Sequence, residues 1–277
     1  MDLNKEENPV KFKGEIPIAL KEKTTFKVSS IDDVKSLLPQ MKACLEEYSF
    51  VRITGLIDKE KILSAKKKID QNFNFMEDRA SIGEDPKEIQ RNFRKLSIGG
   101  AQQFGVYRPR CLRTIYNPLW DEDIFELHES FKTMAKVRNL FYGFQENFAI
   151  DGVEDDMWTA SRIHHYPTGG GFLISHRDTV VPKVHKKQGY SGFHQLIMVL
   201  SKKGIDYQDG GGFATLGGKQ YFYEAEAEYG DIAIYDGATV HGVADIDPEL
   251  PFDQKSSSGR MVAFVTLYKD IDKGYKI

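Results

Sequence analysis

Residues 230–244 read GDIAIYDGATVHGVA, and the fold of the chain depends on how this stretch is arranged. Its first part, 232–235, is a short run of apolar, β-branched and aromatic residues. The run ends at Asp236-Gly237, residues typical of turns, and a second short run begins at His241. The stretch therefore predicts a strand, a turn and a second strand that begins with a histidine.

The same pattern recurs throughout the half of the chain that follows Trp158. Short runs rich in β-branched and aromatic residues alternate there with glycine-rich turns. The runs are SRIHHYP (161–167), GFLISHRD (171–178), HQLIMVLS (194–201), GGFATLGG (211–218), KQYFYEAE (219–226), GDIAIYDG (230–237), HGVADI (241–246) and RMVAFVTLY (260–268). Strands at this spacing predict an all-β sandwich or barrel.

The first half of the chain indicates mainly helix. Ser30 is a candidate N-cap for a helix from 31 to about 48, in which Pro39 predicts a break or a kink. Asp58 is a candidate N-cap for a second helix, which ends near residue 73. Apolar residues spaced by three and four predict the longest helix over 122–149, and 50–53 reads as a short strand.

Together these elements predict one α+β domain, 1–277, with a mainly β core. The helix-rich part, 1–157, includes a basic loop at 89–120 and supports the β-rich part, 158–277. We expect this second part to form a double-stranded β-helix, a cupin-like jelly roll, that carries the functional site.

Three residues of the β-rich half have side chains that commonly bind metal ions. His176 and Asp178 are two positions apart, so on an extended strand both side chains point to the same side. His241 would arrive from a later strand packed opposite. Two histidines and one carboxylate form the facial triad that holds non-haem Fe(II) and leaves the opposite face of the ion open. The sequence therefore predicts a metal site.

Other interpretations of these histidines exist. The tripeptide His-x-Asp is common in proteins that bind no metal, and six of the seven histidines lie within 164–241. His164, His165, His185 and His194 are alternative candidates for the site, or residues of the core.

The segments around the triad resemble the Fe(II)/2-oxoglutarate-dependent oxygenase superfamily over about residues 160–268, in particular its isopenicillin-N-synthase-like and plant-type branches. Those enzymes carry Arg-x-Asn-Tyr-Tyr-Pro, then His-x-Asp, a distant His and Arg-x-Ser. The corresponding segments here are RIHHYP (162–167), HRD (176–178), His241 and RMV (260–262). His164 replaces the asparagine, Val262 replaces the serine, and Arg260 lies further from His241 than in the plant-type branch.

The resemblance implies Fe(II), 2-oxoglutarate as co-substrate and O2. It implies that His176, Asp178 and His241 bind the iron, that Arg260 pairs with the distal carboxylate of 2-oxoglutarate, and that Tyr166 donates a hydrogen bond to the same carboxylate. Arg162 is the alternative to Arg260.

The implied activity is a dioxygenase that oxidises, most simply by hydroxylation, a C–H bond of a small molecule, with release of succinate and CO2. Because the carboxylate Asp178 is present, the resemblance favours hydroxylation over halogenation. The chemistry centres on iron, and no separate acid or base of the protein is assigned.

The basic loop provides candidates for substrate binding. Between Glu88 and Asp121 the chain has no acidic residue but carries Arg108, Arg110 and Arg113, which predict an anionic small-molecule substrate or, equally, a solvated basic face. Gln195 is expected to point into the barrel, and the loops at 179–192 and 244–258 are candidate lids.

Composition restricts the class of protein. A net charge of -3 without a basic stripe argues against nucleic acid as a partner, and no apolar run is long enough for a membrane span. Two cysteines, Cys44 and Cys111, and the lack of a secretory signal predict a cytoplasmic location. Two alternatives to the oxygenase are a cupin-type metal enzyme that does not use 2-oxoglutarate, either an isomerase or a dioxygenase, and a non-catalytic β-sandwich binding module.

Overall fold

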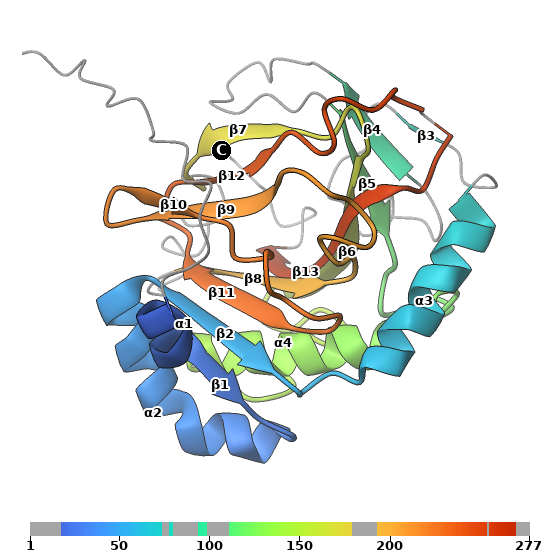
Figure 1. The fold of residues 1–277 in the computed structure, drawn as a ribbon. Coiled ribbons are helices and arrows are strands. Elements are labelled where there is room, and N and C mark those ends of the chain that lie inside the picture. Colours follow the sequence, from blue (N-terminus) through green and yellow to red (C-terminus); the bar gives the residue numbers. More distant parts are fainter. Residues whose placement is uncertain are drawn as a thin grey trace, which may run out of the picture.

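Two β-sheets that pack face to face form the centre of the molecule (Figure 1). The computed structural model describes residues 18–73, 78–79, 94–98, 111–178, 193–253 and 255–269. The large sheet has the strand order β1 (Thr25–Lys27), β2 (Phe50–Thr54), β11 (Ile232–Asp236), β8 (His194–Val199), β13 (Gly259–Lys269), β6 (Met157–Pro167), β5 (Cys111–Tyr116), β4 (Arg94–Ile98) and β3 (Asp78–Arg79). The small sheet has the order β10 (Lys219–Tyr221), β9 (Gly211–Leu216), β12 (His241–Ala244) and β7 (Leu173–His176).

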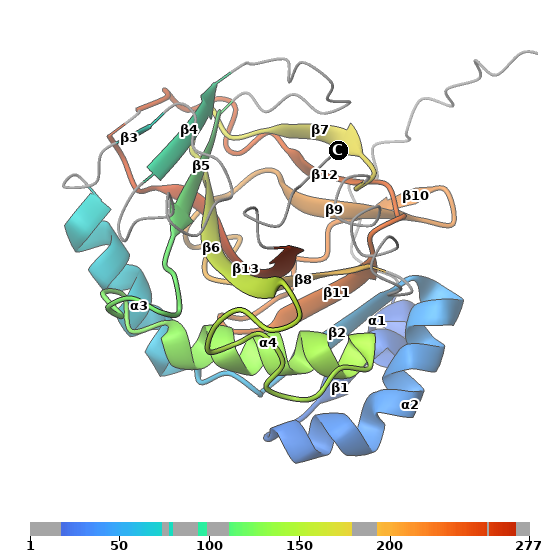
Figure 2. The same ribbon diagram turned by 180° about the vertical axis from the view of Figure 1, so that it is seen from behind.

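Helices cover the outer face of the large sheet, as Figure 2 shows from behind. They are α1 (Ile18–Thr24), α2 (Ile31–Tyr48), α3 (Lys59–Asn72) and α4 (His128–Tyr142). Apolar side chains of α2, α3 and α4 share one core cluster with Ile53, Ile234 and Ala263 of the sheet. The predicted jelly roll with helices on one side is therefore confirmed. No helix in the described segments is long and apolar enough to cross a membrane.

Alternate side chains along the strands of the large sheet point either toward the covering helices or toward the small sheet. On β13, Met261 and Ala263 belong to the core beneath the helices, whereas Val262 and Phe264 pack in the cluster between the two sheets. Successive side chains of a strand point to opposite faces, so Arg260 lies on the inner face with Val262 and Phe264. The register of β13 with β6 places Tyr166 opposite Arg260 on that same inner face.

Two helices, α2 and α3, begin directly after the residues predicted to cap them. The side chain of Ser30 accepts a hydrogen bond from the backbone N–H of Asp33 at 3.1 Å, and that of Asp58 accepts one from Glu60 at 2.9 Å. These caps satisfy amide groups that have no partner within the first turn of a helix. A break or a kink was predicted at Pro39, and α2 continues through this residue without a break; the predicted strand at 50–53 is β2.

The prediction of a helix over 122–149 is too long, because α4 spans only His128–Tyr142. Its start is fixed by Asp123, whose carboxylate accepts hydrogen bonds from the backbone N–H groups of Leu127 and His128, both at 2.9 Å. Its end is fixed by Gly143, which has a left-handed φ of 78°. The expected strand at 219–226 is likewise shorter, since β10 ends at residue 221 and a turn follows.

Candidate metal centre

The three predicted ligands meet where β7 and β12 pair. His176 is the last residue of β7 and His241 the first of β12, and the antiparallel register sets them directly opposite each other. Asp178 follows β7, and its backbone N–H donates to the carbonyl of Gly237 at 3.2 Å, in the turn before β12. The strand-turn-strand stretch at 230–244 therefore positions both His241 and Asp178.

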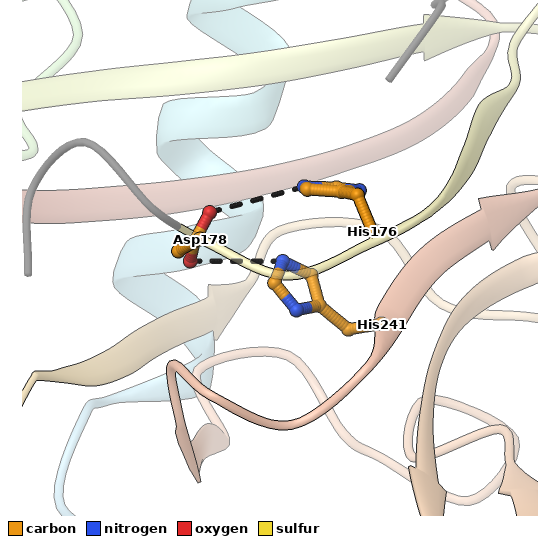
Figure 3. Close-up of side chains that lie close together, drawn as sticks. All are labelled: His176, Asp178 and His241. Atoms are coloured by element: carbon orange, nitrogen blue, oxygen red, sulfur yellow. Dashed lines mark ion pairs between the residues drawn. The ribbon is translucent and has the colours of Figure 1, made fainter. Parts of the chain in front are cut away.

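The ligand atoms converge on one point, as Figure 3 shows. Nε2 of His176 lies 3.8 Å from Oδ1 of Asp178, and Nε2 of His241 lies 3.7 Å from Oδ2. Two atoms that each bind a common ion at about 2.1 Å are separated by at most about 4.2 Å, so both pairs fit a shared ion. One ligand atom from each residue lies within 4.8 Å of the other two.

Backbone carbonyls orient both imidazole rings. Nδ1 of His176 is 2.8 Å from the carbonyl oxygen of Ile174, and Nδ1 of His241 is 2.9 Å from that of Thr239. A carbonyl oxygen only accepts, so in each ring Nδ1 carries the proton and Nε2 presents a lone pair toward Asp178. This is the tautomer and the outer support that metal-binding histidines use.

Burial further prepares the site for a cation. Burial, and then the neighbouring ring of His241, lower the pKa of His176 below the ordinary 6.5, and burial also lowers the pKa of His241. Burial raises the pKa of Asp178, although His176 and Arg162 oppose the rise. Oδ2 of Asp178 is buried without a hydrogen bond to any described residue. Neutral imidazoles beside a half-buried carboxylate that has one buried, unsatisfied oxygen fit a divalent ion.

Arg260 and Tyr166 lie together in the interior, but Arg260 already has a carboxylate partner. Its Nε lies 2.7 Å from Oε2 and 3.0 Å from Oε1 of Glu224, and its Nη2 also donates to Oε1. The Arg260 guanidinium lies 5.0 Å above the ring of Tyr166, whose hydroxyl makes no hydrogen bond within the described part of the chain. Glu224 therefore already occupies one hydrogen-bonding edge of Arg260, the arginine that was predicted to bind the co-substrate.

Sequence reasoning missed Glu224. It begins the series Glu224, Glu226 and Glu228, which has the pattern of a solvated acidic turn. Glu226 and Glu228 do pair with lysines near the surface, Lys21 and Lys202. Only Glu224 turns inward, and its neighbours in sequence give no signal of this.

The structure separates the remaining substrate candidates. Gln195 is half-buried on β8, opposite Tyr235, on the inner face of the large sheet as expected. Arg113 is fully buried on the other face, where its guanidinium lies 5.6 Å from the ring of Phe73 next to α3. This placement argues against direct contact between Arg113 and a substrate at the triad. Arg108, Arg110 and the 179–192 loop lie outside the described residues.

The alternative arginine and histidines occupy distinct environments. Arg162 lies opposite Phe264 on the inner face, and its Nε donates to His164 at 3.2 Å. His165 is fully buried and contacts the carbonyl of Ser258 at 2.8 Å, and His194 packs against Tyr142. Among the described residues, none of these histidines joins the triad, and His185 is outside them.

The candidate lid at 244–258 packs on the glycine turn after β6. The backbone N–H of Gly169 donates to the carbonyl of Ile246 at 2.9 Å, and a Cβ on Gly169 would lie 2.3 Å from the carbonyl oxygen of Leu250. Since Gly169 has a φ of 74°, a glycine suits both the backbone conformation and this close approach.

Comparison with known proteins finds similar structures at low sequence identity but no matching sequence. No family model matches the chain, and no curated protein sequence matches it. One similar structure is the non-heme alpha-ketoglutarate-dependent epimerase SnoN from nogalamycin biosynthesis, with 10% identity and a TM-score of 0.48 over 85% of this chain and 84% of that one. Another is EctD from S. alaskensis with 2-oxoglutarate and 5-hydroxyectoine, with 14% identity and a TM-score of 0.46 over 83% of this chain and 75% of that one.

Proposed function

We propose that the chain is an Fe(II)- and 2-oxoglutarate-dependent dioxygenase that oxidises a C–H bond of a small molecule, with hydroxylation as the expected outcome. One observation carries the proposal: two imidazoles, each anchored through Nδ1, turn Nε2 toward the carboxylate of Asp178. This donor set is typical of non-haem iron enzymes that activate O2. The two cysteines, Cys44 and Cys111, are buried thiols, which supports a reducing compartment such as the cytoplasm.

Each residue of the site would have a limited task. His176, His241 and Asp178 would hold Fe(II), which would activate O2, the oxidant, for oxidation of the substrate coupled to conversion of 2-oxoglutarate to succinate and CO2. Arg260 would face the co-substrate through Nη1, which makes no hydrogen bond among the described residues. Tyr166 supports the guanidinium from below through its ring.

The proposed substrate is a small molecule with an anionic group. The acid-free stretch with Arg108 and Arg110 supports this proposal, and Gln195 is an inner-face residue that could contact such a molecule. Once a substrate is known, Arg108→Ala or Arg110→Ala should raise its apparent KM. An unchanged KM in both variants would refute the anionic substrate.

The first test is an anaerobic titration of the metal-free protein with Fe(II), with and without 2-oxoglutarate. We expect a weak visible metal-to-ligand charge-transfer band only when both are present. His176→Ala and Asp178→Ala should abolish the band because each removes a ligand. The control His128→Gln, at the start of α4 and outside the triad, should retain it. Release of succinate then allows substrates to be screened.

A metal enzyme that does not use 2-oxoglutarate is the second candidate, and one observation favours it. Glu224 already gives Arg260 a bidentate carboxylate partner, so the interior does not require a second one. Metal binding without the charge-transfer band would support this candidate, and absence of metal binding would refute both enzymes.

A further inference from the structure

Glu224 and Arg260 form an ion pair inside the jelly roll. Their side chains are 2% and 1% exposed. Both carboxylate oxygens of Glu224 accept from Nε of Arg260, at 3.0 and 2.7 Å, and Oε1 also accepts from Nη2. The pair therefore occupies the Nε–Nη2 edge of the guanidinium, which is one of the two edges that a carboxylate can bind side by side.

Two further donors hold Glu224 in this place. Its Oε2 accepts from the hydroxyl of Tyr207 at 2.8 Å and from the backbone N–H of Gly212 at 3.1 Å. Burial alone would raise the pKa of Glu224, but Arg260, Gly212 and Tyr207 together lower it, so the group is an anion. A ligand that displaced Glu224 would have to replace all of these contacts in a buried place, which makes displacement unfavourable.

The packing around the pair is tight as well. A Cβ added at Gly212 would lie 2.3 Å from Oη of Tyr223 and 2.7 Å from Nη2 of Arg260. Nη2 of Arg260 also lies 3.5 Å from Oη of Tyr223, so the remaining hydrogen-bond direction of Nη2 is partly used. Nη1 is the nitrogen of Arg260 with no hydrogen bond inside the described part of the chain.

The charge of Arg260 is therefore already balanced. An incoming carboxylate at Nη1 would be attracted by the guanidinium and repelled by the carboxylate of Glu224, a few ångströms further away. Because the Coulomb energy falls only with the first power of distance, the repulsion cancels a large part of the attraction. The second carboxylate of a dicarboxylate co-substrate gains little at such a site.

We propose that Glu224 is a specificity-determining residue that makes this protein select its co-substrate by the 2-oxo acid end, and that 2-oxo acids with uncharged tails are accepted nearly as well as 2-oxoglutarate. This inference rests on the proposed function, because it assumes that a 2-oxo acid binds at the triad. It concerns the end of the co-substrate that the metal does not touch.

The test compares two 2-oxo acids that differ only at the distal end, 2-oxoglutarate and 2-oxopentanoate. Each is titrated anaerobically into the full-length Fe(II)-loaded protein, and its Kd is obtained from the charge-transfer band. A hydrogen bond to a charged group is worth roughly ten- to a hundredfold in affinity, so a neutralised Arg260 should leave the two Kd values within about tenfold of each other.

Substitution of Glu224 provides the second arm. In Glu224→Gln the charge of Arg260 is no longer balanced, so 2-oxoglutarate should bind at least about tenfold more tightly while 2-oxopentanoate is unchanged. Tyr207→Phe removes a hydrogen bond from Glu224 but keeps its charge, and should leave the Kd ratio unchanged. Glu228→Gln, the same substitution at a surface glutamate, is the matched control.

The outcomes are distinguishable. A wild-type preference for 2-oxoglutarate of more than about tenfold would overturn this inference and leave the proposed function standing. A folded Glu224→Gln protein with the wild-type ratio would also overturn it. If the Glu224→Gln variant does not fold, the ratio of the two Kd values in the wild-type protein is the test. No band with either acid would overturn the proposed function and this inference together.

Discussion

Glu224 and Arg260 are two opposite charges in the interior. This buried pair is stable only because further hydrogen bonds satisfy the carboxylate of Glu224. Removing charges from water costs several kcal/mol for each ion, and their attraction offsets this cost only when further hydrogen bonds satisfy the remaining atoms. Tyr207 and Gly212 supply those bonds. Removing one partner would leave the other charge buried, at a cost of about 3–5 kcal/mol.

The pH dependence of stability should report this ion pair. Because the pKa of Glu224 lies below its ordinary 4.5 in the folded protein, its contribution is complete above pH 4.5 and is lost as the pH falls through the folded pKa. Urea unfolding measured between pH 3 and 7 should show stability rising with pH up to about pH 4.5, with no further rise from Glu224 above that pH. In Glu224→Gln the slope should be shallower by up to about 1.4 kcal/mol per pH unit.

Tyr207→Phe is the control for this experiment. It removes one hydrogen bond that lowers the pKa of Glu224, so the loss of stability should begin at a slightly higher pH while the carboxylate still titrates. Identical pH slopes in the wild type and in Glu224→Gln would contradict an ionised Glu224.

Gly212 should be intolerant of the smallest side chain. In Gly212→Ala the new Cβ would meet Tyr223 and Arg260 at distances that real Cβ atoms do not show, so the pair must shift. We expect a loss of about 1–3 kcal/mol in the free energy of unfolding, measured with urea. In Gly152→Ala the Cβ meets no atom within 4 Å, so this variant is the matched control, and equal losses in the two would refute the argument.

The triad was predictable from sequence, whereas Glu224 was not. The side chains of His176 and Asp178 converge because of a local rule, the alternation along an extended strand, and His241 follows a recognisable turn. Glu224 follows no such rule, since its partners Tyr207, Gly212 and Arg260 are between 12 and 36 positions away and meet only when the strands are assembled.

The start of α2 is determined by hydrogen bonds between residues close together in the sequence. Ser30 caps its first turn, and the carboxylate of Asp33 accepts in return from the backbone N–H of Ser29 at 2.8 Å. These reciprocal bonds fix where the helix begins, and the same residues made the start predictable from sequence. The ends of α4 were not predictable from periodicity, because Phe144 and Phe148 continue the apolar spacing while packing in a separate cluster.

The cap of α2 can be tested directly. Ser30→Ala should lower the free energy of unfolding by about 1 kcal/mol, because the N–H of Asp33 loses its acceptor. The measurement is urea unfolding followed by circular dichroism. Ser64→Ala, at an exposed position inside α3, is the matched control and should be neutral or slightly stabilising, since alanine is the better helix former. A neutral Ser30→Ala would show that the cap contributes nothing.

For the whole molecule, the ion is expected to act as a ligand of the folded state alone, because the triad joins two strands and does not exist in the unfolded chain. A ligand at about a hundred times its Kd stabilises the folded state by about 2.7 kcal/mol. For a chain of this size we expect the Tm to rise by roughly 5 °C with Fe(II) or with Mn(II) as an air-stable substitute. Asp178→Ala should lose this rise, and His128→Gln should keep it.

The two-sheet architecture was predictable because the strand runs are short, regular and separated by glycines. What sequence could not give is the distribution of residues between the two layers. Arg113 and Arg162 are both arginines on neighbouring strands, yet the register places them on opposite faces of the large sheet. A register shift of one residue between the two strands would move one arginine to the face of the other. Only the hydrogen bonds of the assembled sheet exclude that shift.

The position of β7 has a consequence for the order in which the protein assembles. β7 is the last strand of the small sheet and pairs there with β12 alone, so His176 reaches His241 only after a loop of 65 residues has closed. Because β7 is an edge strand of that sheet, we expect it to join late in folding, after β12 has paired with β9. An ion captured at this point arrives after the rate-limiting barrier has been crossed, so it should slow unfolding while leaving the refolding rate almost unchanged.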